Sequence, residues 1–215
     1  MHFGINVRPG KYGLKLNRDS YAIINTESSF DIKMSEVEYT DETNRFYTDK
    51  WAKEYQEAIL KNFDLNMEYY SLLNRNEFNK EVTGFIEAYC FDAISDLNDY
   101  KNQSGYYLMI LDDYCQVYIG TCNNIYRRIR EHWKRTKSFD RLLFPMWNIE
   151  KSRLSIDSFR PLDTTRLYAL KCDDTYDFED KYINHFSDEF ICNRIGGGSM
   201  KSVVKIIASI KERSL

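Results

Sequence analysis

The sequence lacks the segments that mark membrane and secreted proteins. No apolar run approaches the roughly 18 to 20 residues that a bilayer-spanning helix needs. Residues 1 to 13 do not show the charged-then-apolar pattern of a signal peptide. We therefore expect a cytoplasmic protein with no membrane partner.

The sequence also lacks paired cysteine motifs. Its five cysteines are an odd number and form no CxxC pair, so they indicate neither a disulfide framework nor a zinc site. Free cysteine behaves as a small apolar residue. We expect reduced and mostly buried thiols at Cys90, Cys115, Cys122, Cys172 and Cys192.

Residues 1 to 100 contain no phosphate-cradling glycine motif, no metal-ligand cluster and no repeat. They carry a net charge of −7, from 11 Lys and Arg against 18 Asp and Glu, whereas residues 101 to 215 carry +4. The acidity argues against direct phosphate contact by the first half. Recognition, dimerisation and folding support all stay open as its role.

The hydrophobic content of 43% is enough to build a core, in one domain or two. Residues 12–16 and 21–25 read as strands on either side of a turn at 17–20, and residues 29–34 alternate like a third strand. From about Trp51 to Leu97 the apolar spacing lengthens to a helical period, which predicts two or three helices. The first 100 residues therefore form an N-terminal α+β region, and the polar residues 99–104 mark a boundary.

Residues 105 to 133 contain the most informative pattern. An apolar run from Tyr106 to Leu111 turns at Asp112 and Asp113 and returns through residues 117–120, which predicts a β-hairpin. A helix follows, because Asn123 or Asn124 can accept hydrogen bonds from its first-turn amides.

The spacing within this helix separates two faces. Ile125, Ile129 and Trp133 recur every four residues and predict a buried stripe. Arg128 and His132 share a neighbouring face, so a guanidinium and an imidazole should lie side by side near the hairpin.

These residues resemble the GIY-YIG nuclease family. The resemblance covers about residues 104 to 198 and rests on five elements in order: Gly105-Tyr106-Tyr107, Tyr118-Ile119-Gly120, Arg128 with His132, Glu179 in DFEDKYINHF, and Asn193 in ICNRIGGG. Tyr106 departs from the aliphatic residue usual in the first motif, but tyrosine also suits a strand. The resemblance implies an α/β (α+β) domain over residues 104 to 200, with a three-stranded antiparallel sheet flanked by helices.

The rest of this domain is predicted from local pattern. Residues 138–163 read as loop-like with one short helix, residues 165–170 as the third strand, and residues 176–186 as a helix. Residues 196–198 are three glycines, which either form a turn or let backbone amides approach a phosphate. An amphipathic C-terminal helix is expected over residues 200–215.

The resemblance also implies the site. Glu179 is the expected ligand of a single Mg²⁺ or Mn²⁺ ion, since hard cations prefer oxygen ligands. Tyr107 is the expected base, and Tyr118 assists it or orients the phosphate. Arg128 matches phosphate geometry with its planar fork and is expected to stabilise the transition state, His132 to share the phosphate or relay a proton, and Asn193 to orient a tyrosine or the backbone.

A basic run surrounds this helix and can neutralise the phosphate backbone of DNA although the whole chain has a net charge of −3. A solvated helix face is the alternative for a charge run alone. The candidate DNA-binding residues are Arg127, Arg130, Lys134, Arg135 and Lys137.

We therefore expect a divalent-metal-dependent DNA endonuclease with a restriction-like or phage-defence role. Cutting both strands with one site per chain favours a homodimer. A nucleic-acid-binding or partner-dependent module without cleavage, a protein-interaction adaptor built on the acidic half, and RNA as substrate are the alternatives.

Overall fold

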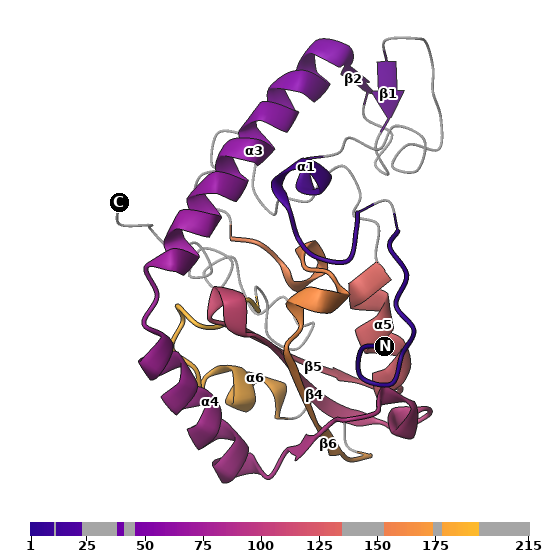
Figure 1. Ribbon diagram of the computed structural model, residues 1–215, viewed down its shortest axis with the longest axis vertical. Helices are drawn as coiled ribbons and strands as arrows, with labels where there is room; N and C mark the ends of the chain where they lie inside the picture. Colours follow the sequence, from indigo (N-terminus) through magenta and orange to yellow (C-terminus); the bar gives the residue numbers. More distant parts are fainter. Residues whose placement is uncertain (11, 23–37, 41–45, 135–152, 174–177, 194–215) are drawn as a thin grey trace.

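The computed structural model describes residues 1–10, 12–22, 38–40, 46–134, 153–173 and 178–193 (Figure 1). The fold is α+β, with a four-stranded antiparallel sheet flanked by helices. The strand order is β3-β6-β4-β5, formed by Asp92–Ala93, Arg166–Lys171, Gly105–Leu111 and Gln116–Cys122. None of the helices in the described ranges is both long and apolar enough to cross a bilayer.

Strand β4 is one of the two inner strands of the sheet, and all seven of its residues are buried. Because successive side chains of a strand point to opposite faces, Tyr107, Met109 and Leu111 join one apolar cluster. Tyr106 and its alternate neighbours join a second cluster on the other face. The near-continuous apolar run in β4 thus reflects burial on both faces.

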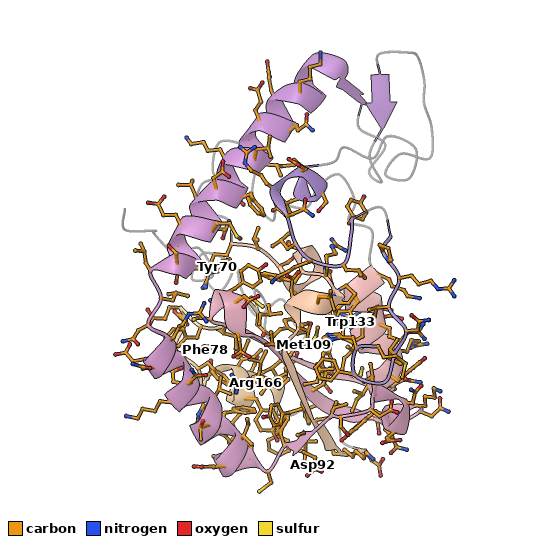
Figure 2. The ribbon with its side chains drawn as sticks, viewed as in Figure 1. Tyr70, Phe78, Asp92, Met109, Trp133 and Arg166 are labelled. Atoms are coloured by element: carbon orange, nitrogen blue, oxygen red, sulfur yellow. The ribbon has the colours of Figure 1, made fainter. Side chains whose placement is uncertain are left out.

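The two faces are covered by different elements. Helix α5, Ile125–Lys134, packs with the N-terminal segment on the Met109 side, whereas α4, Arg75–Tyr89, and α6, Glu179–Ile183, cover the other side. In Figure 2, Met109 lies between Phe78 of α4 and Trp133 of α5. The sheet is therefore the middle layer of three.

The predicted hairpin, the third strand, the helix after the hairpin and the helix within residues 176–186 are confirmed. The β4–β5 connection is a single 3-10 turn over Asp112–Tyr114, and Cys115 takes the left-handed conformation that closes it. Helix α3, Asp49–Ser71, and α4 supply the helices predicted after residue 51. The α6 helix begins at Glu179 in the described residues, within the predicted range of 176–186.

The sheet has one strand more than the three predicted. Strand β3 pairs with β6 through Asp92 and Ala93. Both of these residues are exposed and the strand is two residues long, so no alternation of apolar and polar residues indicated it. This strand comes from the region predicted to end at residue 100.

The predicted strands at residues 12–16 and 21–25 are wrong where the structure describes them. The oxygen of the Asn17 side chain accepts from the Ser20 N–H at 2.9 Å and caps a short helix, α1, Arg18–Tyr21. The amide of Leu16 donates to Asp163 rather than to a neighbouring strand. A short hairpin does form further on, between β1, Glu38–Thr40, and β2, Phe46–Thr48.

Several predictions lie outside the described residues: the strand at 29–34, the short helix within 138–147, the glycines at 196–198 and the helix at 200–215. The N-terminal region shares the apolar cluster of the sheet, through Ile5, Leu16 and Phe63 among others. Phe3 stacks on Trp133 with ring centroids 6.4 Å apart, and its carbonyl accepts from the Leu97 amide. The first residues thus pack directly on α5.

Candidate active site

Two glycines allow close approach between the strands and their neighbours. Gly120 lies opposite Tyr107 in the β4–β5 register, and a Cβ at residue 120 would overlap the Tyr107 hydroxyl. Gly105 has a φ of +143°, and a Cβ there would overlap the Leu170 carbonyl of β6. Both positions therefore require glycine, because a Cβ at either one would overlap a neighbouring atom.

Helix α5 is oriented by its cap and its apolar stripe. The Asn124 side chain accepts from the Arg127 N–H at 2.9 Å, which satisfies one of the free first-turn amides. Ile125, Ile129 and Trp133 are buried as predicted. This anchoring leaves Arg128 and His132 directed toward the strands.

Tyr107, His132 and Asp157 form a hydrogen-bonded chain. The Tyr107 hydroxyl lies 2.8 Å from Nε2 of His132, and Nδ1 of His132 lies 2.7 Å from Oδ1 of Asp157. A carboxylate can only accept, so it places the imidazole proton on Nδ1 and leaves Nε2 to accept from the phenol. The buried imidazole, 2% exposed, is thereby ready to take the tyrosine proton.

Tyr107 itself is fully buried. Burial raises its pKa well above the ordinary value, the neighbouring Tyr118 adds to this, and the guanidinium of Arg128 opposes it. The phenol is therefore protonated at neutral pH in the free protein. If the phenol were to lose this proton, His132 lies in place to accept it and Arg128 to offset the resulting charge.

Arg128 supplies the positive charge of the site. Burial lowers its pKa, but the phenols of Tyr107 and Tyr118 and the carboxylate of Glu131 raise it overall, so the guanidinium stays charged. One third of the side chain remains exposed, and Nη1 lies 3.4 Å from Oε2 of Glu131. A guanidinium held beside two phenols and still reachable from solvent can bind a phosphate.

Tyr118 lies on the exposed side of the same cluster. Its ring meets that of His132 edge-on, with centroids 5.0 Å apart. Its pKa is raised to about 12, chiefly by burial; Arg128 opposes the rise and the Glu179 carboxylate adds to it. Within the described ranges its hydroxyl makes no hydrogen bond, and the residue is only partly buried. Tyr118 is thus better placed than Tyr107 to meet a ligand from solvent.

Glu179 opens α6 and is 7% exposed. Burial raises its pKa to about 7, the neighbouring Asp180 adds to the rise, and Arg128 opposes it. Among the described residues it has no hydrogen-bond or ion-pair partner. The charges of Glu179 and Arg128 both act on Tyr118, which places the acid in the same electrostatic neighbourhood.

These properties fit a hard divalent cation. Mg²⁺ is commonly held by one or two carboxylates while it keeps several waters, so a single buried and unpartnered carboxylate is a suitable protein ligand. No group of three or more His, Cys, Asp or Glu suited to a metal occurs in the described part of the chain.

Asn193 acts on the backbone of β5. Its Oδ1 accepts from the Ile119 N–H at 2.9 Å, and its Nδ2 donates to the Ile119 carbonyl at 2.6 Å. It thereby fixes the strand at the residue between Tyr118 and Gly120. Of the two partners predicted for Asn193, a tyrosine or the backbone, it contacts the backbone.

The predicted DNA-binding residues occupy another side of α5. Helical spacing places Arg127, Arg130 and Lys134 together, roughly opposite Arg128 and His132. Arg127 is exposed and lies 3.5 Å from Glu131, while Arg130 stacks over Tyr126. Arg135 and Lys137 lie outside the described residues.

Asp157 was missed from the sequence. It lies in the 3-10 turn Ile156–Ser158, within the stretch predicted to be loop-like, and a single acid in a loop carries no periodic signal. The buried Arg153 was also missed, although it donates to the Gln116 side chain at 2.8 Å and to the carbonyl of Asp188 at 2.7 Å. Its contacts fix the end of β5 against residues 188–189.

None of the five cysteines forms a disulfide. Cys115 and Cys192 are buried, whereas Cys90 is exposed, so burial is less complete than expected.

Comparison of the chain with protein-family models, with curated proteins and with solved structures finds no match.

Proposed function

We propose that the protein is a divalent-metal-dependent endonuclease of the GIY-YIG type that hydrolyses phosphodiester bonds in DNA. The observation that carries this proposal is the cluster of Tyr107, Tyr118, Arg128 and His132 on β4, β5 and α5. The charge of Glu179 acts on this cluster through Tyr118, and Asn193 holds the Ile119 backbone next to it. The site combines the charged Arg128 with a buried acid and two phenols. Such a combination can bind a phosphate and a cation together.

Arg128 binds the scissile phosphate in this proposal. Its guanidinium donates to the phosphoryl oxygens, on which negative charge increases in the transition state. The Tyr118 hydroxyl, which is free to donate within the described part of the site, orients the same group. Glu179 would hold the cation, which when bound supplies Lewis-acid stabilisation of the phosphate and lowers the pKa of bound water.

Tyr107 accepts the proton of the attacking water. Before this it passes its own proton to Nε2 of His132, and Asp157 stabilises the resulting imidazolium through Nδ1. The Tyr107 phenolate is stabilised by Arg128. Asp157 is a positioning residue here, because it acts only through His132.

Cleavage assays test the proposal directly. Purified protein is incubated with supercoiled plasmid and unmodified phage DNA, with magnesium or with EDTA, beside the Glu179→Ala variant. The matched control is Glu87→Ala, which removes an exposed glutamate of α4 on the same side of the sheet. We expect magnesium-dependent cutting by the wild type and the control only.

The form of the products tests the biological setting. Discrete fragments favour a restriction-like or phage-defence enzyme, whereas a smear favours an unspecific nuclease. A parallel digest of matched RNA decides the sugar preference, and light scattering with and without DNA tests the homodimer. No cutting of DNA or RNA by folded wild-type protein would reject an independently active nuclease and favour a binding module or a nuclease that needs a partner.

A further inference from the structure

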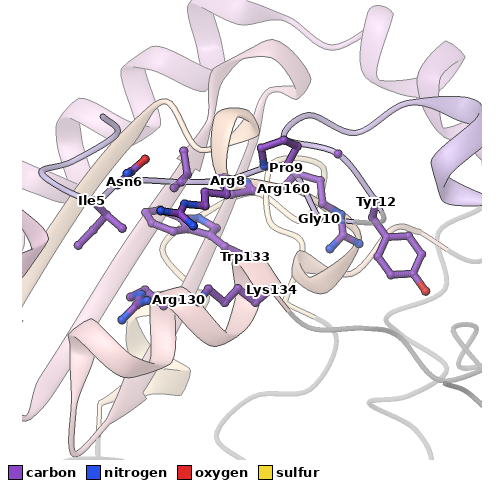
Figure 3. A pocket seen from close by; sticks show the side chains of 13 residues that line it. Ile5, Asn6, Arg8, Pro9, Gly10, Tyr12, Arg130, Trp133, Lys134 and Arg160 are labelled. Carbon is purple, nitrogen blue, oxygen red and sulfur yellow. The ribbon is translucent and has the colours of Figure 1, made fainter.

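A pocket of about 590 Å³ lies on the other side of α5 from Arg128 and His132 (Figure 3). Residues 5–10, 12 and 13 form one wall, α5 contributes Arg130, Trp133 and Lys134, and residues 160–161 close it. Its volume falls in the range of small-molecule sites. It lies apart from the proposed catalytic residues.

The charge lining this pocket has one sign. Arg8, Arg130, Lys134 and Arg160 come from three separate segments of the chain, and the described lining includes no Asp or Glu. Arg8 and Lys134 are exposed and have no ion-pair partner in the described ranges. Bringing Arg8, Arg130 and Lys134 to one pocket is unfavourable unless an anion offsets the repulsion between their charges.

The cations on the inner wall are held in place. Arg160 is 4% exposed, stacks over the Tyr12 ring at 5.0 Å, and donates to the Asp157 carbonyl at 3.2 Å. Arg130 stacks over Tyr126 at 4.8 Å and donates to its hydroxyl. Fixed guanidinium groups lose little rotational freedom when they bind an anion.

The floor of the pocket is apolar and rigid. Ile5, Val7, Trp133 and Pro161 contribute to it. The Trp133 indole N–H donates to the Thr164 hydroxyl at 3.0 Å, and its ring packs on Phe3. A flat apolar floor beneath a cationic rim suits a ligand with a flat ring and an anionic group, which is the chemistry of a nucleoside phosphate.

We propose that this pocket binds a nucleoside phosphate, with the phosphate among Arg8, Arg130 and Lys134 and the base over the floor. The ligand is either a free nucleotide or one nucleotide of a single strand, and the two share this chemistry. The site is separate from the proposed phosphodiester cleavage, because it uses the opposite side of α5. It also places Arg130 and Lys134 in a defined pocket rather than on an open DNA-binding face.

Calorimetry in EDTA tests the site without any dependence on nuclease activity. The probes are deoxyadenosine monophosphate, deoxyadenosine, inorganic phosphate and a short single-stranded oligodeoxyadenylate. The variants are Arg8→Gln and Lys134→Gln, both at exposed positions, and the matched control is Lys80→Gln, which removes an exposed charge from α4. Thermal unfolding confirms that each variant is folded.

We expect the monophosphate to bind more tightly than deoxyadenosine or phosphate alone. Arg8→Gln and Lys134→Gln should each raise its Kd about tenfold, the loss of one charge-assisted hydrogen bond, while Lys80→Gln leaves it unchanged. An oligonucleotide that binds more tightly than the monophosphate, with the same sensitivity to the variants, identifies a strand as the ligand. Tighter or equal binding of the monophosphate identifies a free nucleotide.

Three results would overturn the proposal. The first is that neither the monophosphate nor the oligonucleotide binds the wild-type protein. The second is that Lys80→Gln weakens binding as much as the pocket variants do, or that the pocket variants bind normally. The third is that deoxyadenosine or phosphate alone binds as tightly as the monophosphate. Failure of the DNA cleavage assay affects none of these readouts.

Discussion

Nδ1 of His132 lies 2.7 Å from Oδ1 of Asp157, and the ring's other nitrogen lies 2.8 Å from the Tyr107 hydroxyl. The imidazole therefore joins a buried phenol to a carboxylate that is one fifth exposed. This arrangement selects one tautomer, and the proposed proton transfer from Tyr107 requires that tautomer.

Asp157→Asn should slow DNA cleavage about 10- to 100-fold, the usual cost of losing a group that orients a functional histidine. The amide no longer enforces the Nδ1–H tautomer, because it can donate as well as accept. Asp113→Asn is the control, since that carboxylate is half exposed and pairs with Lys15.

The tautomer itself is measurable. The chain has only three histidines, so the ¹⁵N shifts of the His132 ring can be assigned in both proteins. We expect a single Nδ1–H form in the wild type and a mixture in Asp157→Asn. An unchanged tautomer together with unchanged cleavage would remove Asp157 from the mechanism.

The raised pKa of Glu179 makes stability depend on pH. The folded-state pKa of about 7 exceeds the ordinary value of 4.5, so the folded state holds the proton more tightly than the unfolded state. This contribution is complete below about pH 4.5 and is lost as the pH rises through 7. The loss amounts to about 2 to 3 kcal/mol at pH 8.

Glu179→Gln should abolish this dependence. Urea unfolding in EDTA, measured from pH 4.5 to 8, should show the variant gaining about 2 to 3 kcal/mol over the wild type across that range. Magnesium should stabilise the wild type more at pH 8 than at pH 5, because the ion requires the carboxylate form. Parallel pH profiles of the two proteins would contradict the burial-based shift.

Glycine substitutions at two positions should have opposite effects. Gly120→Ala forces a Cβ into the Tyr107 hydroxyl, so the ring must move away from His132, which costs about 1 to 3 kcal/mol of unfolding free energy. Gly84→Ala lies within α4, where the new Cβ meets only an ordinary contact at 3.9 Å. It should stabilise the fold by about 0.5 to 1 kcal/mol.

Both variants are compared by thermal unfolding and by DNA cleavage. Only Gly120→Ala should lose activity, because only it displaces Tyr107. Equal stability of the two variants would show that Tyr107 can shift without cost.

The two tyrosines should differ in their effect on stability when each is changed to phenylalanine. Tyr107→Phe leaves Nε2 of the buried His132 without its partner, so stability should fall by about 1 to 3 kcal/mol along with activity. Tyr118→Phe removes a hydroxyl that has no hydrogen bond in the described part of the structure. It should change stability by less than about 0.5 kcal/mol while cleavage falls.

Melting temperature and cleavage rate, measured for both proteins, check this separation. A Tyr118→Phe variant as active as the wild type would show that Arg128 binds the phosphate without the Tyr118 hydroxyl. A Tyr107→Phe variant with full activity would exclude Tyr107 as the base.

The hairpin and α5 could be predicted because their patterns are local. The apolar run of β4, the cap at Asn124 and the four-residue spacing up to Trp133 each determine structure within a few residues. Local propensity did not indicate that Glu179 and Asn193 lie near the hairpin. That prediction came from the order of the motifs in the family that the chain resembles.

The missed features depend on distant partners. The exposed strand β3 exists because β6 offers it hydrogen bonds, and Asp157 matters only because His132 lies beside it. Asn17 was read as part of a turn, yet it caps a helix, because asparagine suits both roles and the choice is made by tertiary contacts. The pocket, too, is assembled from segments that are neighbours only after folding.

The hydrogen bond from the Leu16 amide to the Asp163 carboxylate joins residues 147 positions apart. During synthesis the N-terminal segment leaves the ribosome long before its acceptor is made, so this amide stays bonded to water until three quarters of the chain exist. Asp163 also accepts from the Tyr114 hydroxyl at 3.0 Å and from the Arg160 amide. The Asp163 carboxylate, which is synthesised late, thus joins the first residues to the sheet. A contact between residues so distant in sequence slows folding relative to a chain of local contacts.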